Sequence, residues 1–136
     1  MAPLTCDEFL NGIRLCTRAT VIKFQHNFYQ QIFGCPMGSS LSGALANLVM
    51  VDLETSTLEH IPRDTISIFS RYVDNIFAFL QWSIIQQLLT VLNAYHPRLQ
   101  FTIEMESNLQ LPFLDVLVTC DNAGLHTMVY AKPTAT

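Results

Sequence analysis

The fold of this chain is organised around the stretch Arg71-Tyr72-Val73-Asp74-Asn75-Ile76-Phe77. An apolar run, Ile66–Phe69, precedes it, and a second, Ile76–Leu80, follows. Two β-prone runs joined by a tight Asp/Asn turn predict a β-hairpin. The turn would place the Asp74 carboxylate at an exposed tip, where it could bind a hard cation through oxygen. The alternative is that Asp74 and Asn75 are ordinary turn residues.

Composition favours a folded protein that does not bind nucleic acid strongly by itself. The 136 residues are 50% hydrophobic, which suits one domain with a core, and only 13% charged, which argues against disorder. The formal net charge is −4. A self-sufficient nucleic-acid binder is usually basic, so this charge argues against strong binding by this chain alone.

Cysteine usage and the lack of targeting signals predict an intracellular protein. The four cysteines form no CxxC pair, and no histidine lies at zinc-ligand spacing, so we expect reduced thiols. No apolar run reaches the ~18 residues of a transmembrane helix, and Met1-Ala2-Pro3 has no basic leader. We therefore expect no membrane partner, while nucleus and cytoplasm both stay open.

The N-terminal region predicts a helix followed by a hairpin. Thr5 and Glu8 have the spacing of a capping box, so a helix is expected from Cys6 to about Arg18. We interpret Asp7 and Glu8 as capping residues and not as a catalytic pair.

Two β-prone runs, Val21–His26 and Phe28–Phe33, then predict a second hairpin that turns at His26 and Asn27. His26 is interpreted as a turn residue, with a metal-ligand role as the alternative.

A glycine-rich loop, Gly34–Ser42, follows this hairpin and leads into a helix. Its glycines and proline exclude a continuing strand, and its last hydroxyl residues can cap a helix. The helix should run to about His60 with one buried stripe, made of Leu41, Leu45, Leu48, Val49 and Leu53. Such a loop can accept a flat ring or a phosphate against its backbone, or it is a plain connection. It is not a Walker loop, because the terminal Lys-Ser/Thr is missing.

The last third of the chain predicts one helix and three strands. Ser83 should cap a helix that ends near Tyr95, with a buried stripe of Ile84, Ile85, Leu88, Leu89 and Leu92. Alternation over Phe101–Glu106 predicts a strand whose solvated face carries Glu104 and Glu106. Two further strands, Phe113–Thr119 and Leu125–Tyr130, should be joined by a turn at residues 121–124.

Four segments of the chain resemble the palm of a reverse transcriptase. They are Tyr29–Ser42 (family pattern YxQxxGxPMGSPLS), Tyr72–Asn75 (YxDD), Leu111–Val116 (the segment that leads to the primer grip) and Tyr130–Thr136 (YRKPTxT). Ala46–Leu48 continues the first segment, and Glu54 lies where family helices often carry a glutamate. The last two segments resemble Penelope-like retroelements in particular.

The resemblance implies an α+β fold in which a ferredoxin-like antiparallel sheet packs on helices, as in the reverse-transcriptase palm. Residues 1–136 would then be a partial reverse transcriptase domain, truncated at its N-terminus. It would extend from just before the Gly-Pro-Met-Gly loop to the start of the thumb connection.

The implied reaction is template-directed transfer of a nucleotide from a dNTP to a primer 3′-hydroxyl. Family members copy an RNA template onto a DNA primer, with two Mg²⁺ (or Mn²⁺) ions that contact the attacking and leaving oxygens. Asp74 matches the first Asp of the YxDD box and would be the metal ligand, and Tyr72 would pack near the primer end. Positions that match family contacts to nucleotide and template base are Gln31, Gly34, Pro36, Met37, Gly38 and Ser39. Gly38 would allow close approach because it lacks a side chain.

Several departures from the family pattern predict that this chain is inactive alone. Asn75 replaces the second Asp of the box, so metal binding should be weak or absent. The strand that carries the earlier catalytic Asp is expected before Thr5 and is not in this sequence. Ser40 and Gly43 stand where the pattern usually has proline, and Ala131 stands where it has arginine. Arg98 is the sole Lys or Arg between Leu80 and Ala131, and it is a poor acid.

The missing strand would leave an edge of the Asp74 hairpin unpaired, so self-association is expected. Two other interpretations stay open. A retained palm could bind nucleic acid or a protein without catalysis, or the chain could be a compact α+β domain of unrelated function.

Overall fold

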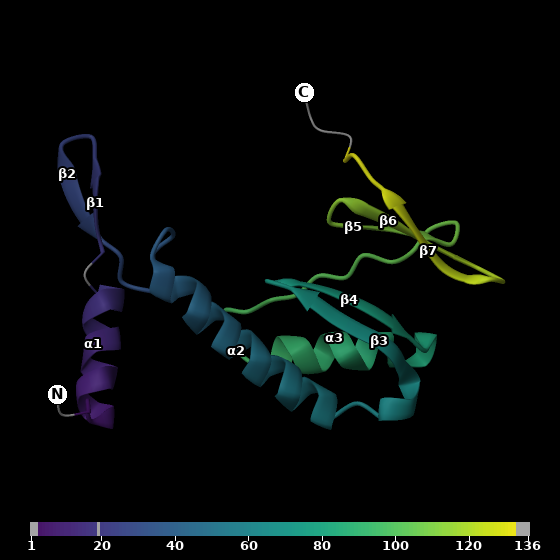
Figure 1. Ribbon diagram of the computed structural model, residues 1–136, viewed down its shortest axis with the longest axis horizontal. Helices are drawn as coiled ribbons and strands as arrows, with labels where there is room; N and C mark the ends of the chain where they lie inside the picture. Colours follow the sequence, from purple (N-terminus) through teal and green to yellow (C-terminus); the bar gives the residue numbers. More distant parts are fainter. Residues whose placement is uncertain (1–2, 19, 133–136) are drawn as a thin grey trace. The chain divides into compact units, whose positions relative to one another are not determined.

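The computed structural model describes residues 3–18 and 20–132, and it has a mixed α+β fold with small antiparallel sheets (Figure 1). The chain divides into two compact units, Met1–Asp52 and Leu53–Thr136. The main cluster of buried side chains belongs to the second unit. No helix within the described residues combines the length and the hydropathy needed to cross a membrane.

The first unit begins with α1 (Cys6–Arg18), whose predicted bounds are confirmed. The capping box is formed as expected. The backbone N–H and the hydroxyl of Thr5 both donate to Glu8 Oε2 at 2.8 Å, and the Glu8 N–H donates to Thr5 Oγ1 at 3.3 Å. These bonds satisfy donors that the first turn of any helix leaves open.

The hairpin predicted between Val21 and Phe33 is present, and its turn lies one residue earlier than predicted. β1 (Val21–Phe24) pairs with β2 (Asn27–Gln30), and Phe24 lies opposite Asn27. The turn residues are Gln25 and His26, whose φ values are 45° and 70°. Two successive positive φ values are the geometry of a type I′ turn, which matches the twist of a two-residue hairpin. His26 is therefore a turn residue, as interpreted.

Helix α2 (Ser40–Glu59) starts and ends close to the predicted positions. The prediction that one stripe of this helix is buried is wrong. Leu53 is buried, whereas Leu48 and Val49 are exposed. The buried positions are Met50, Leu53 and Thr57. Apolar residues occur on every face of α2, so the sequence offers several equivalent stripes and periodicity cannot choose among them.

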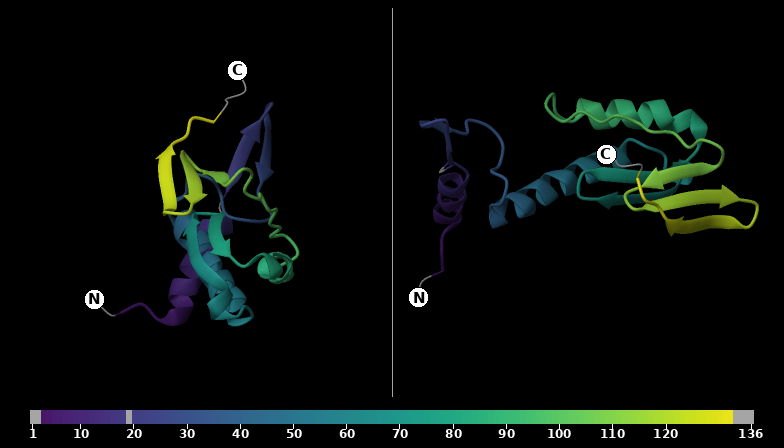
Figure 2. Two further views of the ribbon diagram at one scale, coloured as in Figure 1. Left: turned by 90° about the vertical axis from the view of Figure 1, so that its right-hand side faces the viewer. Right: turned by 90° about the horizontal axis from the view of Figure 1, so that it is seen from above.

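The core of the second unit forms between helices and the central hairpin. This hairpin consists of β3 (Ile66–Tyr72) and β4 (Asn75–Leu80), and it follows a short 3₁₀ turn, η1 (Arg63–Thr65). Leu53, Ile61, Leu88 and Leu92 are buried together, and side chains of β3 and β4 pack against them. The hairpin lies between α3 (Ile85–Ala94) and the sheet of the last three strands (Figures 1 and 2).

Ser83 does not cap α3, contrary to prediction. It lies inside a 3₁₀ turn, η2 (Trp82–Ile84), and α3 begins at Ile85 without a side-chain cap. A capping residue needs an extended backbone, but Ile84, which directly precedes α3, already has a helical one. The stripe prediction for α3 is confirmed at Leu88 and Leu92, which are buried. Trp82 is 77% exposed.

The predicted strand Phe101–Glu106 is wrong. The segment has no strand pairing, and Glu104 and Glu106 are exposed residues of a connection. Asn93 of α3 takes the place of a neighbouring strand at Phe101. Its side-chain oxygen accepts from the Phe101 N–H at 2.6 Å, and its side-chain nitrogen donates to the Phe101 carbonyl at 3.1 Å. Alternation predicts which side chains face water but not whether a partner strand exists.

The chain continues with a three-stranded antiparallel sheet in the order β5-β6-β7. Its strands are β5 (Gln110–Phe113), β6 (Val116–Asp121) and β7 (Gly124–Val129). The predicted strand Phe113–Thr119 is interrupted, because Leu114 has a φ of 55° and begins a turn that pairs Phe113 with Val116. The predicted turn after β6 is confirmed, and the Asp121 carboxylate accepts from the N–H of Ala123 at 2.7 Å.

One aromatic contact connects the hairpin to this sheet. The rings of Phe77 in β4 and Phe113 in β5 lie with their centroids 5.4 Å apart, at an interplanar angle of 56°. A tilted pair at this distance is a favourable aromatic arrangement. It fixes β4 beside the first strand of the sheet. The four cysteines form no disulfide in this fold.

Candidate functional site

The tip of the β3–β4 hairpin carries Asp74, as the sequence predicts. Tyr72 lies opposite Asn75 in the register, so the two turn residues are Val73 and Asp74 and not Asp74 and Asn75. Asn75 is the first residue of β4. The Asp74 carboxylate is exposed, and Tyr72 beside it is 60% exposed. The side chains that the YxDD-like box contributes are therefore accessible from solvent.

Val73 adopts a backbone conformation that valine rarely tolerates. Its φ is 58°, in the left-handed region, and its side chain is 62% exposed. This region costs a residue with a Cβ roughly 1–2 kcal/mol, and a β-branched side chain there is an outlier. Because the Val73 side chain is mostly in water, its own packing does not offset that cost. Other groups must hold the turn in place.

Arg71 contacts both the helix and the turn. Its Nε lies 2.6 Å from Glu54 Oε1 in α2, and its Nη1 donates to the Val73 carbonyl at 2.8 Å. The two side chains are largely shielded, at 13% exposed for Arg71 and 22% for Glu54. Glu54 is thus engaged in an ion pair.

Sequence reasoning assigned no role to Arg71, and it noted Glu54 only as a position shared with a family. The two residues are 17 positions apart and belong to different elements. No local periodicity joins them. The one available signal was an arginine directly before the box in a chain with few charges.

Asp74 supplies one exposed carboxylate, which is the type of ligand that Mg²⁺ prefers. Mg²⁺ in polymerase-type sites commonly keeps several waters and is held by one or two carboxylates together with substrate phosphates. The Asn75 side-chain nitrogen donates to Asp74 Oδ1 at 3.1 Å, which orients the carboxylate and occupies one lone pair. Across the described part of the chain, no group of three or more His, Cys, Asp and Glu side chains could hold a metal ion. A cation at this tip would therefore have few ligands from those residues.

The glycine-rich loop belongs to the first unit and closes on itself. Ser42 Oγ donates to the Pro36 carbonyl at 2.6 Å, and Gln31 Nε2 donates to the Phe33 carbonyl at 2.7 Å. Gly34 and Gly38 have φ values of 77° and 85°, which a residue with a side chain would adopt only under strain. A Cβ at Gly38 would meet nothing within 4 Å. The backbone conformation thus favours glycine there, and the space beside it is open.

The predicted contact residues of this loop differ in exposure. Met37 is fully exposed, and Gly34 and Gly38 are exposed as well. The remaining members, Gln31, Pro36 and Ser39, are half-buried. All six belong to the first unit, whereas Tyr72, Asp74 and Asn75 belong to the second. Each unit therefore carries its own set of candidate residues.

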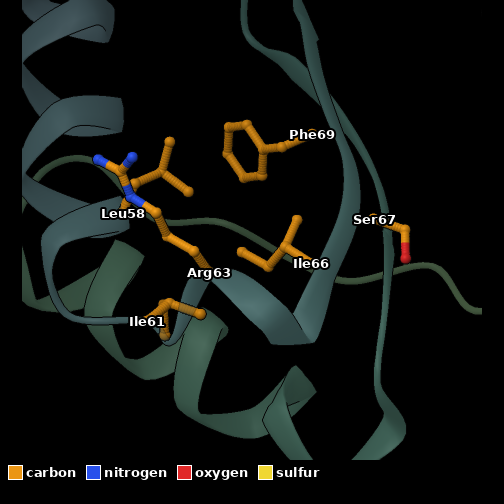
Figure 3. A pocket seen from close by; sticks show the side chains of 6 residues that line it. All are labelled: Leu58, Ile61, Arg63, Ile66, Ser67 and Phe69. Carbon is orange, nitrogen blue, oxygen red and sulfur yellow. The ribbon is translucent and has the colours of Figure 1, made fainter.

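A small cavity of the second unit lies away from the Asp74 tip. It has a volume of about 260 Å³ and is lined by Leu58, Ile61, Arg63, Ile66, Ser67 and Phe69. Figure 3 shows the apolar side chains of Leu58, Ile66 and Phe69 converging, while Ser67 points away. The lining offers one cation and no carboxylate, so it has no ligands suited to a metal ion.

One further titratable pair stabilises a turn. The pKa of Asp121 is lowered, chiefly because the Ala123 N–H donates to its carboxylate, and His126 Nε2 lies 3.1 Å from the same oxygen. Both side chains are exposed, and the bonds close the turn between β6 and β7. This arrangement is typical of an Asx turn and indicates a structural role.

We compared the chain with known proteins. No protein-family model, no curated protein and no solved structure matches it.

Proposed function

We propose that this chain is part of the palm of a retroelement reverse transcriptase, most similar to the Penelope-like group. The four resembling segments are distributed along the chain between Tyr29 and Thr136. The family reaction is the two-metal transfer of a nucleotide from a dNTP to a primer 3′-hydroxyl, directed by an RNA template. The mixed α+β fold supports the proposal at the level of fold class. The strands of the described residues form three small antiparallel sheets and not the single ferredoxin-like sheet that the resemblance implies.

The observation that carries this proposal is the tip of the β3–β4 hairpin. An exposed aspartate follows a residue with a positive φ, an exposed tyrosine flanks the turn, and an ion pair anchors it to α2. A positive φ at the first turn residue is common in two-residue hairpins, and Leu114 has one as well, so the backbone of Val73 alone does not mark this turn. What distinguishes this turn is the side chain of Arg71, which binds both Glu54 and the Val73 carbonyl.

Each side chain of the tip would have a distinct task. Asp74 would hold the cation, and Tyr72 would pack against the end of the primer. Mg²⁺ bound there would supply charge stabilisation to phosphate oxygens. In the first unit, Gln31 and the loop from Gly34 to Ser39 would contact the incoming nucleotide and the template base. We expect this chain by itself to bind the cation weakly, because Asn75 adds no charge.

Paramagnetic broadening by Mn²⁺ tests this proposal. Mn²⁺ is added to the ¹⁵N-labelled chain, and the amide signals of residues 72–76 are followed. We expect selective broadening there, which Asp74→Ala removes. A matched control is Asp115→Ala, since Asp115 also follows an apolar residue of positive φ in a hairpin turn. Equal broadening at both turns would contradict a dedicated site at Asp74.

A non-catalytic role is the second candidate, and one observation favours it. Asn75 replaces a carboxylate, and its amide already donates to Asp74 Oδ1. A retained palm could then bind nucleic acid or a protein. Fluorescence anisotropy with a labelled RNA–DNA primer-template at low salt distinguishes a palm with a cation at Asp74 from a palm that only binds nucleic acid. Binding that Asp74→Ala leaves unchanged would favour the non-catalytic role.

A further inference from the structure

We infer that Arg71 is a positioning residue, which fixes the Asp74 turn by tying it to α2 through Glu54. Only the link from this turn to cation binding by Asp74 rests on the proposed function. The contacts themselves are a 2.6 Å ion pair between Arg71 Nε and Glu54 Oε1, and a 2.8 Å hydrogen bond from Arg71 Nη1 to the Val73 carbonyl.

The guanidinium makes both contacts at once because it is a rigid fork. Nε and Nη1 point in different directions on one plane, so the position of Glu54 determines where Nη1 is presented. A lysine at this position has one ammonium group and cannot reproduce the planar two-point geometry. The low exposure of both side chains, 13% and 22%, reduces the screening that weakens surface ion pairs.

The bond to Val73 acts on the peptide that joins it to Asp74. The Val73 carbonyl belongs to the same rigid peptide plane as the Asp74 nitrogen. Holding that oxygen therefore restricts both the ψ of Val73 and the φ of Asp74. Val73 would otherwise tend to leave its positive φ of 58°, and the Asp74 carboxylate would turn with it.

Glu54 also balances the charge of Arg71. An uncompensated guanidinium bonded at the turn would repel a divalent cation and attract the Asp74 carboxylate. The carboxylate of Glu54, 2.6 Å from Arg71 Nε, neutralises this positive charge on the side of α2. The two residues thus position the turn and leave Asp74 as the exposed negative group at its tip.

The test compares four variants of the full chain. Arg71→Met leaves Glu54 without its partner, so the chain could lose stability. Glu54→Met/Arg71→Met replaces both charges and should keep the fold while removing the anchor. Arg71→Lys is the conservative variant, and Arg63→Met is a matched control because Arg63 lies elsewhere in the unit.

Two readouts are followed in each variant, amide hydrogen exchange at residues 73–75 and Mn²⁺ affinity at Asp74. For the double variant we expect an unchanged unfolding midpoint, turn exchange at least about tenfold faster, and Mn²⁺ affinity lower by about tenfold or more. Arg71→Lys should recover only part of either quantity, and Arg63→Met should change neither.

The outcomes separate this inference from the proposed function. If the double variant folds and its turn amides exchange at the wild-type rate, the positioning role is overturned. If the wild-type chain binds no Mn²⁺ but the turn still loosens in the double variant, Arg71 positions the turn and the cation-binding role proposed for Asp74 fails.

Discussion

A valine with a left-handed backbone is an unusual choice at the tip of an exposed hairpin. Val73→Gly should stabilise the second unit by about 0.5–1 kcal/mol, since the relief of strain exceeds the added chain entropy of glycine. Val73→Ala keeps a Cβ and should give no gain. Urea denaturation followed by circular dichroism measures both. A destabilised glycine variant would mean that the exposed valine side chain contributes packing that its position does not suggest.

Asp74 and Asn75 predict a second outcome at this scale, which concerns activity. The purified chain should incorporate no nucleotide above an Asp74→Ala control in a template-dependent primer-extension assay. Loss of one catalytic carboxylate costs several kcal/mol of transition-state stabilisation, and each ~1.4 kcal/mol is a factor of ten in rate. Incorporation above the control, in Mg²⁺ or Mn²⁺, would disprove this prediction.

Asn75→Asp alone should not restore activity. It adds one charge, but it also replaces the amide that donates to Asp74 Oδ1 with a carboxylate that repels it. The same extension assay is the measurement. Detectable extension by this variant would mean that another carboxylate of the chain, such as Asp7 or Glu104, reaches the cation.

At the scale of elements, the cap of α1 has a defined pH dependence. The pKa of Glu8 is lowered by the backbone N–H of Thr5 first and by its hydroxyl second. The stabilisation from Glu8 is therefore complete above its unfolded pKa of ~4.3, and it is lost as the pH falls through the lower folded value. Amide shifts of the first turn should follow this loss. Glu8→Gln keeps an acceptor but does not titrate, so its shifts should stay flat.

The contact between α3 and the following connection depends on one side chain. Asn93→Ala should destabilise the second unit by about 1–3 kcal/mol, because it leaves the part-buried backbone groups of Phe101 without partners. Gln86→Ala, at an exposed position of the same helix, should stay within about 0.5 kcal/mol. Chemical denaturation of both variants gives the comparison, and equal midpoints would contradict the role of Asn93.

Local chemistry explains which elements the sequence predicted well. The capping box of α1, the loop before α2 and the turns of both hairpins depend on neighbours in the chain, and the two turns were found within one residue. The strand ends were less accurate, since β2 ends at Gln30 and not at Phe33. The strand at residues 101–106 was wrong because a strand needs a distant partner. The turn at Leu114 was missed because leucine gives no signal for a positive φ. The ion pair between Arg71 and Glu54 joins different elements, so no local pattern could reveal it.

At the scale of the whole molecule, exposed apolar surface predicts association. Helix α1 has no buried residue, every residue of β1 and β2 is exposed, and Phe24 and Phe28 are among them. The strands β3 and β4 form a two-stranded sheet, so within the described residues each keeps an edge without a partner strand. We expect sedimentation that depends on concentration and weak near-UV circular dichroism. A single sharp monomer with strong aromatic signals at tens of micromolar would contradict this.

The exposed position of Trp82 determines how this molecule would look to a spectroscopist. It is the one tryptophan of the chain, and its indole faces water at the start of the short turn that leads into α3. Its emission should therefore be red-shifted in the folded state and should change little when the core around Leu53 and Leu92 melts. A partner that covers this junction would shift the emission to the blue. The tryptophan fluorescence of this chain should therefore report binding at Trp82 and should change little on unfolding.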